Sequence, residues 1–534
     1  MTEKRQILKS TSVITLATLA SRLFGYIRDQ RVALLLGTSI LSDSFYLAFR
    51  IPNVLRRVVA EGAMSASFVP VFTSYQVEQT QEEALEFANR LFWTLAVILA
   101  IVTTLGIIFS PAIVHVFTIM GHNNVQWTAA VGLMRIMFPF IFFIGLSALC
   151  MGILNCYRVF ALPALTPAVS NIAIIIFSSA MVWRFFHSAA ISLAVGVSVG
   201  GLLQFLMQLP QLVRKGMRFR CGISFSDPGI RKIGMLMLPG VFGLGVAQIN
   251  VLVDTLFLTS SRMPAGSVTA LYYADRIMQL VLGSYAVAVA TAILPMMSRQ
   301  AKMMDLAGVK QTLGFAVRIV SFITIPAAVG ILVLRQPIVR VLFQHGQFVA
   351  ESTILTARAL LFYVTGLPAI SAVKLIVQGF YSTRDTRTPV VIAAGVLALN
   401  FILNSIFLTY LFSYLKNGGP ALATAISAYV NCGVLFWIFR KRHGVIGATE
   451  ILHSSGKVIA SAALMGSLCW LAVQYAHVGS HPSLGVDAAL LAGTIAGAAA
   501  IYLGLTWLFR STEIREVYEI VFKRAATSTA EGAA

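Results

Sequence analysis

Charged side chains within apolar stretches are the residues of this chain whose types and positions could do chemistry. They fall in two stretches near the N-terminus, 10–37 and 42–72, and in a third stretch at 267–297. A charge at the centre of a lipid bilayer costs at least ~2.5–3.5 kcal/mol, so such a residue normally faces a water-filled cavity or a charged partner. The residues are Arg22, Arg28, Asp29, Asp43, Arg50, Arg56, Arg57, Glu61, Asp275 and Arg276.

Arginine is in excess over carboxylate in this set, with six arginines against four carboxylates. Ion pairs that only join helices remain an alternative for Asp43 with Arg50 and for Arg57 with Glu61. The excess positive charge survives such pairing, and the guanidinium fork of arginine suits bidentate binding of phosphate or carboxylate. The set therefore predicts an anion-binding site.

The spacing within 42–72 places several of these charges on one helical face. Positions 43, 50, 57 and 61 are separated by seven, seven and four residues, which aligns them in a regular helix. Arg56 would face about 100° away from them. A rotation of the lower part of the helix at Pro52 would bring Arg56 to the same side.

Four polar residues elsewhere in the chain form a second group. Asp254 has no basic residue near it in sequence, and Asn400 and Asn404 share one helical face at i, i+4. Thr424 opens a later apolar stretch. Their carboxylate, amide and hydroxyl oxygens suit a monovalent cation such as Na⁺, and no other cofactor is expected. The alternative is ordinary hydrogen bonding between membrane helices.

The elements that must position these residues are membrane helices. Of 534 residues, 58% are hydrophobic and 11% are charged, against roughly 25% charged in a soluble domain. About fourteen apolar segments are long enough to cross a ~30 Å hydrocarbon core. The predicted fold is an all-α polytopic membrane protein with about fourteen transmembrane helices. The segments are 10–37, 42–72, 91–114, 127–153, 162–183, 189–212, 234–259, 267–297, 314–334, 355–378, 389–413, 420–439, 458–476 and 486–509.

The distribution of basic residues predicts the orientation. With both termini in the cytoplasm, cytoplasmic segments hold about 24 Lys and Arg and the outer loops about five, as the positive-inside rule requires. The net charge of +20 thus lies at lipid headgroups and within the membrane, and no nucleic-acid partner is expected. Arg135 and Arg358, near the starts of apolar segments, are interpreted as snorkelling to the membrane surface.

The sequence also repeats itself. The tetrapeptide 48–51, which contains Arg50, matches 274–277, which contains Arg276, at three of four positions and a shift of 226 residues. Six helices per repeat preserve the orientation, so a pseudo-two-fold axis along the membrane normal would relate the halves. The predicted domains are an N-terminal six-helix lobe at 1–225, a C-terminal six-helix lobe at 226–445, and 446–534, with two additional transmembrane helices and a cytoplasmic tail.

Catalytic motifs are missing from the sequence. We find no Walker motif, no nucleophile elbow and no His or Cys cluster with metal-ligand spacing, and the five cysteines imply no disulfide framework. The sequence therefore predicts a transporter without an ATPase motif and not an enzyme.

Four motifs combine the intramembrane charges with glycine and proline. They are Ser21-Arg22-Leu-Phe-Gly25-Tyr-Ile-Arg28-Asp29, Ile51-Pro-Asn-Val-Leu-Arg56-Arg57-Val-Val-Ala-Glu61-Gly62-Ala63, Tyr272-Tyr-Ala-Asp275-Arg276 and Gly379-Phe-Tyr381-Ser-Thr-Arg384-Asp385-Thr-Arg387-Thr-Pro389. They closely resemble the MurJ (MviN) family, the lipid II flippases of bacterial cell-wall synthesis in the MOP exporter superfamily. The resemblance runs through the whole chain.

This resemblance implies a substrate and a site. The substrate would be lipid II, a disaccharide peptide on undecaprenyl pyrophosphate, moved from the cytoplasmic to the periplasmic leaflet of the bacterial inner membrane by alternating access. Its pyrophosphate would be bound by Arg22, Arg28, Arg56 and Arg276. The other intramembrane charges would form ion pairs or gates in the cavity: Asp29, Asp43, Arg50, Arg57, Glu61 and Asp275.

Further partners and other functions remain open at this point. Membrane lipids are expected partners, as are proteins of cell-wall synthesis. The alternatives in the same superfamily are cation-coupled export of drugs and export of another polyprenyl-pyrophosphate glycan. A scaffold for wall-synthesis enzymes would need larger soluble faces than these short loops provide. An enzyme acting on lipid-linked sugars would need convergent catalytic carboxylates.

Overall fold

The computed structural model describes residues 3–58, 64–121, 124–445 and 447–514, and all regular structure in these ranges is helical. The expected all-α fold is thereby confirmed. Contacts within the chain divide it into two units. Unit 1 comprises Met1–Thr269 with His345–Val349, and unit 2 comprises Ala270–Gln344 with Ala350–Ala534.

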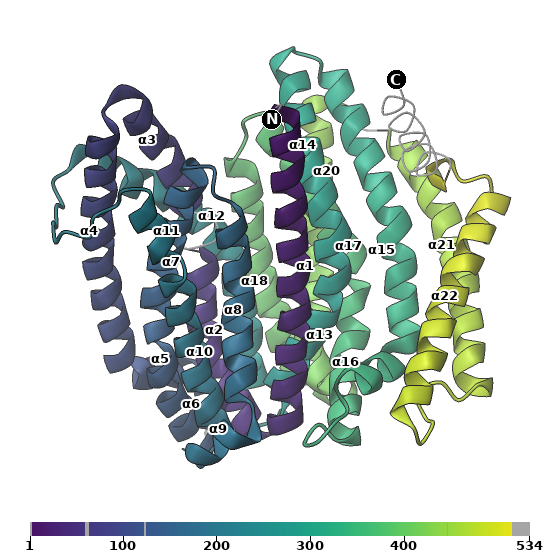
Figure 1. Ribbon diagram of the computed structural model, residues 1–534. Coiled ribbons are helices and arrows are strands. Elements are labelled where there is room, and N and C mark those ends of the chain that lie inside the picture. Colours follow the sequence, from purple (N-terminus) through teal and green to yellow (C-terminus); the bar gives the residue numbers. More distant parts are fainter. Residues whose placement is uncertain (1–2, 59–63, 122–123, 446, 515–534) are drawn as a thin grey trace. The chain divides into compact units, whose positions relative to one another are not determined.

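The long helices of unit 1 run alongside one another (Figure 1). α8 packs against both α1 and α10, and α2 packs against α6. The helices are α1 (Glu3–Leu36), α2 (Ile40–Leu55), α3 (Met64–Glu78), α4 (Gln81–Ile108), α5 (Ser110–Thr118), α6 (Asn124–Met137), α7 (Pro139–Cys156), α8 (Ala161–Phe177), α9 (Ala180–Phe185), α10 (Ala189–Leu206), α11 (Leu209–Arg214) and α12 (Pro228–Leu258).

Unit 2 is built around α15, the longest of its helices, which contacts α14, α16, α17, α21 and α22. α13 begins in unit 1 and continues into unit 2. The elements are α13 (Ser267–Val281), the π-helical η2 (Leu282–Ala286), α14 (Val287–Lys302), α15 (Leu306–Phe343), α16 (Ala350–Thr365), α17 (Leu367–Ser382), α18 (Arg387–Tyr410), α19 (Phe412–Leu415), the short 3₁₀ turn η3 (Lys416–Gly418), α20 (Gly419–His443), α21 (Ala448–Tyr475) and α22 (Leu484–Leu508).

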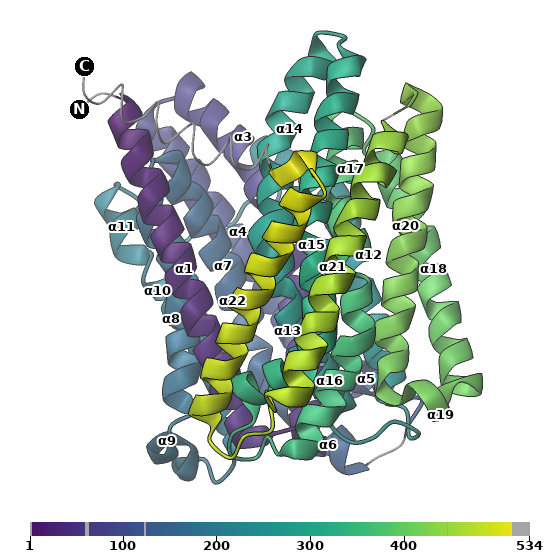
Figure 2. The same ribbon diagram turned by 90° about the vertical axis from the view of Figure 1, so that its right-hand side faces the viewer.

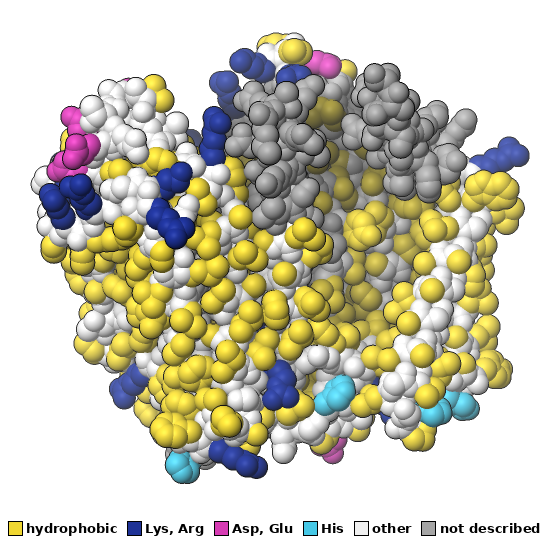
Figure 3. Space-filling view, in the orientation of Figure 1, with side chains coloured by type: hydrophobic (Ala, Val, Ile, Leu, Met, Phe, Trp, Pro, Cys, Tyr) yellow, Lys and Arg dark blue, Asp and Glu magenta, His cyan; other side chains and the backbone are white. Residues whose placement is uncertain are grey.

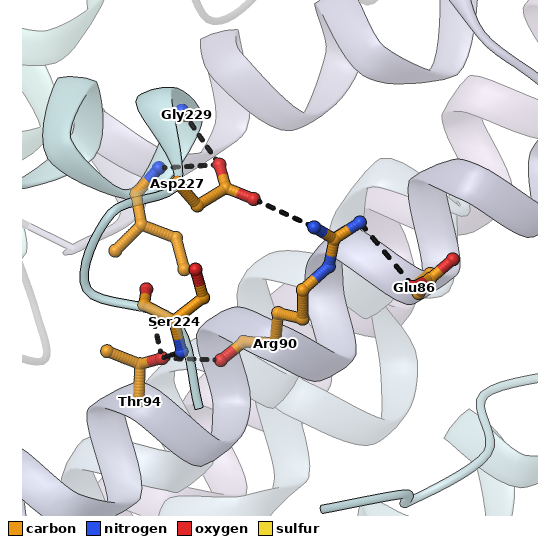
Figure 4. Close-up of polar contacts among 7 residues, drawn as sticks. Glu86, Arg90, Thr94, Ser224, Asp227 and Gly229 are labelled. Atoms are coloured by element: carbon orange, nitrogen blue, oxygen red, sulfur yellow. Dashed lines mark hydrogen bonds and ion pairs between the residues drawn. The ribbon is translucent and has the colours of Figure 1, made fainter. Parts of the chain in front are cut away.

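The start of α12 is fastened to α4 of the same unit (Figure 4). Arg90 of α4 lies between two carboxylates, 3.3 Å from Asp227 and 3.6 Å from Glu86. Asp227 also caps α12, because it accepts the backbone N–H of Gly229 at 2.9 Å. α12 then contacts α2, α3 and α5. The two units are defined by contacts within the chain, whereas the predicted lobes at 1–225 and 226–445 are defined by sequence repeats. The division into units therefore does not test the lobes, which stay a prediction.

Eight helices of the described residues are long and apolar enough to cross a membrane, or nine if α16 and α17, which meet at a 44° bend, form one span. The other predicted segments are also helical, over α1, α2 with α3, α8, α12, and α13 with α14. Hydrophobic side chains cover the middle of the visible helices, and Lys and Arg gather toward their ends (Figure 3). This distribution is typical of a multi-pass membrane protein.

The two C-terminal helices, α21 and α22, lie against α15 (Figure 2). Their shared core includes Phe322 of α15, Met465 of α21 and Tyr502 of α22, whose hydroxyl donates to the Phe322 carbonyl at 2.7 Å. At one end of the helices, Arg340 of α15 lies 3.1 Å from the fully buried Asp487 of α22. These helices therefore form one packed layer within unit 2.

Candidate functional site

Arg28 is held on two sides within unit 1. Its Nε and Nη2 donate to Asp29 Oδ1 at 3.0 and 2.6 Å, and its Nη1 donates to Asn171 Oδ1 of α8 at 2.9 Å. The Arg28 side chain is 15% exposed and that of Asp29 is 8% exposed. The three charges predicted in the first span, Arg22, Arg28 and Asp29, thus lie on α1, and two of them form a part-buried ion pair.

Asn171 was missed by the sequence analysis. Its Nδ2 donates to the Ser21 carbonyl at 3.2 Å, so it joins α8 to α1 at the motif that carries Arg22 and Arg28. Gly25 lies beside Asn171, because a Cβ there would be in van der Waals contact with Asn171 Nδ2 at 3.4 Å. A lone amide in the apolar segment 162–183 was the only signal in the sequence. Arg22 itself is exposed.

The arginines of α2 lie around a change in helix geometry. Pro52 lies inside α2, and residues 56–58 form a π-helical turn. Such a turn alters the angular positions of side chains, so the regular spacing that separated Arg56 from Arg57 does not hold there. Arg56 and Arg57 are both half-buried, and Arg56 Nε donates to Asn53 Oδ1 at 3.2 Å. Glu61 lies outside the described residues.

Arg50 and Asp43 occupy the first part of α2 and have different surroundings. Arg50 Nη1 makes a long contact of 3.5 Å with the Val251 carbonyl of α12. The buried Asp43 carboxylate accepts the backbone N–H groups of Gly266 at 2.8 Å and of Thr269 at 2.9 Å, and the Thr269 hydroxyl at 2.7 Å. Asp43 thus caps the N-terminus of α13.

The contact between Asp43 and Thr269 joins two positions that are 226 residues apart, the shift of the sequence repeat. The hydroxyl groups of Ser42 and Thr269 lie 2.9 Å apart beside it. The relation between the second and eighth spans stays a prediction. We refer to Ser42, Asp43, Gly266 and Thr269 as the α2–α13 clasp.

Arg276 of unit 2 is held by its own helix. Its Nε and Nη2 donate to the Tyr272 hydroxyl at 3.0 and 2.7 Å, and its guanidinium lies 5.0 Å from the centre of the Tyr272 ring. The neighbouring Asp275 accepts from Gln279 Nε2 at 2.6 Å and from the Tyr363 hydroxyl of α16 at 3.3 Å. Neither tyrosine was among the predicted site residues.

A π-helical stretch follows the arginine of each repeat. The first begins at Arg56 and the second, η2, begins at Leu282, and these positions again differ by 226 residues. π-Helical turns inside α-helices occur frequently at functional sites. The second and eighth spans thus change their helix geometry at equivalent positions of the two repeats.

The candidate cation ligands fall in both units. In unit 2, Asn400 Nδ2 donates to Thr424 Oγ1 at 3.2 Å, and Asn404 Nδ2 donates to Asn400 Oδ1 at 3.0 Å. In unit 1, Asp254 is buried in α12. The part of the chain that the structure describes holds no group of three or more His, Cys, Asp or Glu suited to a metal ion. A cation site from Asp254, Asn400, Asn404 and Thr424 stays a prediction.

Two further polar contacts lie at the ends of spans. Arg135 is exposed and donates to the Ser110 hydroxyl at 3.1 Å. Asp385, after α17, caps α18 through the Thr388 N–H at 3.0 Å and pairs with Arg442. Partial burial acts to raise the pKa of Asp385, but the hydrogen bonds from Thr388 and the Arg442 guanidinium outweigh it and lower this pKa below its usual value.

Comparison with known proteins gives matches along nearly the whole chain. A family model described as "Lipid II flippase MurJ" matches residues 32–486. The "Probable lipid II flippase MurJ" of Vibrio cholerae serotype O1 is 35% identical over 525 residues, which cover 95% of this chain and 97% of that protein. The "Lipid II flippase MurJ" of Burkholderia cenocepacia is 33% identical, over 92% of this chain and 95% of that protein.

Solved structures agree with these matches. A "Lipid II flippase MurJ, inward closed conformation" has a TM-score of 0.77 and 28% identity, and the match covers 93% of this chain and 98% of that one. An inward-facing multidrug resistance MATE transporter of the MOP superfamily has a TM-score of 0.68 at 16% identity, over 82% of this chain and 99% of that one. The second match shows a shared fold alone.

Proposed function

The chain belongs to the MurJ family of lipid II flippases, and we propose that it moves lipid II from the cytoplasmic to the outer leaflet of the bacterial inner membrane. The family match over residues 32–486 supports the substrate. The observation that carries the chemistry is the Arg28 guanidinium, fixed by Asp29 and Asn171 inside an apolar helix bundle. A positive fork held in this way suits a phosphate or pyrophosphate group.

A cationic site of this kind is needed to move a charged headgroup through the hydrocarbon of the membrane. The polyprenyl tail of lipid II is soluble in the hydrocarbon of the bilayer. The free-energy cost of moving a bare charge to the bilayer centre is ~10 kcal/mol or more by the higher estimates. Arg22, Arg28, Arg56 and Arg276 would replace the water around the pyrophosphate. The tail would remain in the lipid throughout.

Alternating access requires contacts that form and break at the two membrane faces. We place the N-terminus in the cytoplasm, because this orientation leaves most loop Lys and Arg on that side. α1 then ends outside, and the α2–α13 clasp lies at the outer end of α2. The clasp would keep that end closed, and its three contacts to Asp43 would separate when the transporter opens outward.

The driving force follows from charge. An anion that moves outward across an inside-negative membrane gains ~2.3 kcal/mol per charge per 100 mV. The same field favours return of the empty, positively charged cavity. A cation bound by Asp254 with Asn400, Asn404 and Thr424 would be a second source of energy.

Drug export by cation antiport is the second candidate function, favoured by the shared fold of MATE transporters. A site for cationic drugs would be acidic or apolar. The intramembrane charges of this chain are predominantly arginine, so we favour the anionic lipid.

Cells depleted of their own lipid II flippase test the proposal. Expression of this chain should restore the exposure of lipid II headgroups on the outer leaflet, read by a membrane-impermeant enzyme that cleaves the headgroup. A control with the Arg28→Ala variant, inserted at the same level, should restore little. If the chain inserts normally and the headgroup stays inaccessible, the proposed substrate is wrong.

A further inference from the structure

A pocket of about 320 Å³ lies between the first part of α15 and the start of α21 in unit 2. This volume falls in the range of small-molecule sites. Lys310 and Arg318 of α15 and Glu450 of α21 line the pocket, together with the apolar side chains of Phe315 and Ile451. The pocket thus combines two positive charges, one negative charge and an apolar wall. None of these residues belongs to the anion site described above.

The depth of the pocket follows from the charges of α15. Between Arg318 and Arg335 this helix has no charged residue. Their separation of 17 residues corresponds to about 26 Å along a helix, close to the ~30 Å thickness of the hydrocarbon core. Arg318 therefore lies at one edge of the hydrocarbon, and Lys310 lies further out, among the lipid headgroups. In the orientation proposed above, this edge faces the cytoplasm.

Arg318 lies beside a buried carboxylate of the same unit. Glu513, which is fully buried, lies 3.9 Å from Arg318 Nη1. Its two carboxylate oxygens accept the hydroxyls of Ser454 at 2.6 Å and Ser511 at 2.5 Å. The two hydroxyls hold the Glu513 carboxylate, which places a fixed negative charge beside Arg318.

We propose that this pocket binds the headgroup of a zwitterionic phospholipid with a primary ammonium, of the phosphatidylethanolamine type. The phosphate diester would contact Lys310 and Arg318, and the ammonium would donate hydrogen bonds to Glu450. Phe315 and Ile451 would contact the glycerol and the first part of the acyl chains. The charge pattern favours this lipid over a purely anionic one, because an anionic headgroup would leave Glu450 opposed.

Binding of defined lipids to the purified full-length chain tests the proposal. Native mass spectrometry would compare dioleoyl phosphatidylethanolamine, phosphatidylcholine and phosphatidylglycerol, which share the same acyl chains. The wild type should bind phosphatidylethanolamine about tenfold more tightly than phosphatidylcholine, whose quaternary ammonium has no N–H to donate. Lys310→Gln should weaken phosphatidylethanolamine binding about tenfold.

Glu450→Gln separates this site from a general attraction for phosphate. It should abolish the preference for phosphatidylethanolamine over phosphatidylcholine and raise the affinity for phosphatidylglycerol. Lys441→Gln, which removes an exposed charge from α20 outside the pocket, is the matched control and should change neither. Arg318→Gln would also remove a positive charge from the pocket, but it leaves the buried Glu513 without this cation and can fail to fold. The test therefore relies on Lys310→Gln and Glu450→Gln.

Three results would overturn the proposal. The first is equal binding of the three lipids by the wild type, which would show unselective lipid around the protein. The second is wild-type lipid binding by both Lys310→Gln and Glu450→Gln. The third is displacement of phosphatidylethanolamine by inorganic phosphate as effectively as by glycerophosphoethanolamine, which would show a site for free phosphate.

Discussion

The Arg28 guanidinium has contacts on two of its edges, to Asp29 on its own helix and to Asn171 on α8. Such a fork is already oriented before an anion arrives, so binding costs less side-chain entropy. Lysine at the same position would keep the charge but could not make the same pair of contacts. Replacement of Arg28 by alanine therefore removes both the charge and the hydrogen bonds, whereas replacement by lysine removes only the forked geometry.

Arg28→Ala should reduce lipid II transport about tenfold to a hundredfold, because a charge-assisted hydrogen bond contributes about 1.5–3 kcal/mol. Arg28→Lys should retain an intermediate rate. Arg135→Ala, which removes an exposed arginine bonded to Ser110, is the matched control and should be mild. The measurement is the headgroup-accessibility rate, normalised to the amount of inserted protein. Wild-type rates for Arg28→Ala would contradict the assignment.

The sequence allowed the charged residues of the site to be named but not their partners. Arg28 and Asp29 are adjacent, so their pairing could be anticipated. Asn171 lies 143 residues from Arg28, and an amide in an apolar segment is compatible with many roles. Asp43 was expected near Arg50 or a gate, and its contact with the start of α13 depends on a tertiary approach that periodicity does not encode.

At the scale of elements, the α2–α13 clasp depends on one glycine. Gly266 has φ +86°, and a Cβ there would lie 2.5 Å from the backbone oxygen of Thr38. Only glycine adopts this conformation without strain and also leaves room for Thr38. The close approach brings the Gly266 N–H within 2.8 Å of Asp43.

Gly266→Ala should therefore destabilise the protein by ~1–3 kcal/mol, through the strained backbone and the clash with Thr38. The readout is the thermal unfolding midpoint of the purified protein in detergent. Gly132→Ala serves as the control, because a Cβ at Gly132 meets nothing within 4 Å and alanine favours a helix. An unchanged midpoint for Gly266→Ala would show that the clasp contributes nothing to stability.

Element boundaries show where sequence periodicity is informative. The segment 10–37 was expected to be one helix, and α1 is continuous from Glu3 to Leu36. The segment 355–378 was also expected to be one helix, but a new helix begins at Leu367 with Pro368 in its first turn, and α16 meets α17 at 44°. A bend at proline can be anticipated, whereas its angle depends on the packing of neighbouring helices.

The cap of α18 provides a test of pH dependence. The pKa of Asp385 is lowered in the folded protein, so its ionised carboxylate stabilises the fold. This contribution to stability is fully present above the usual Asp pKa of ~3.9 and is lost as the pH falls through the pKa of the folded protein. Because the Arg442 side chain is half-exposed, we expect its ion pair with Asp385 to contribute no more than ~1 kcal/mol to the free energy of unfolding. Asp385→Asn should flatten the acid side of a plot of unfolding midpoint against pH. An acid side identical to wild type would remove Asp385 as a contributor.

At the scale of the whole molecule, composition predicted the class of the protein and four short motifs predicted its family. The 58% hydrophobic content predicted a membrane protein, and the described helices agree with it. The resemblance from four short motifs is confirmed by the family match over 32–486. The sidedness of the chain rests on loop charge alone and stays a prediction.

Labelling with a membrane-impermeant thiol reagent in intact cells and in inverted vesicles should establish the sidedness. Cys221, an exposed native cysteine before α12, should react only from the cytoplasmic side. In a Cys221→Ser background, an exposed cysteine placed by Lys416→Cys should react only from the outside. Reaction of both positions from the same side would contradict the proposed topology.

The central claim is tested most directly by transport of lipid II in liposomes that contain only this protein. Fluorescent lipid II in the outer leaflet would be quenched from outside, and the fraction that becomes protected would be followed with time. We predict transfer between leaflets with wild-type protein, faster when the potential drives the anion in the direction of transfer, and little transfer with Arg28→Ala. Equal rates for wild type, Arg28→Ala and protein-free liposomes would contradict the account.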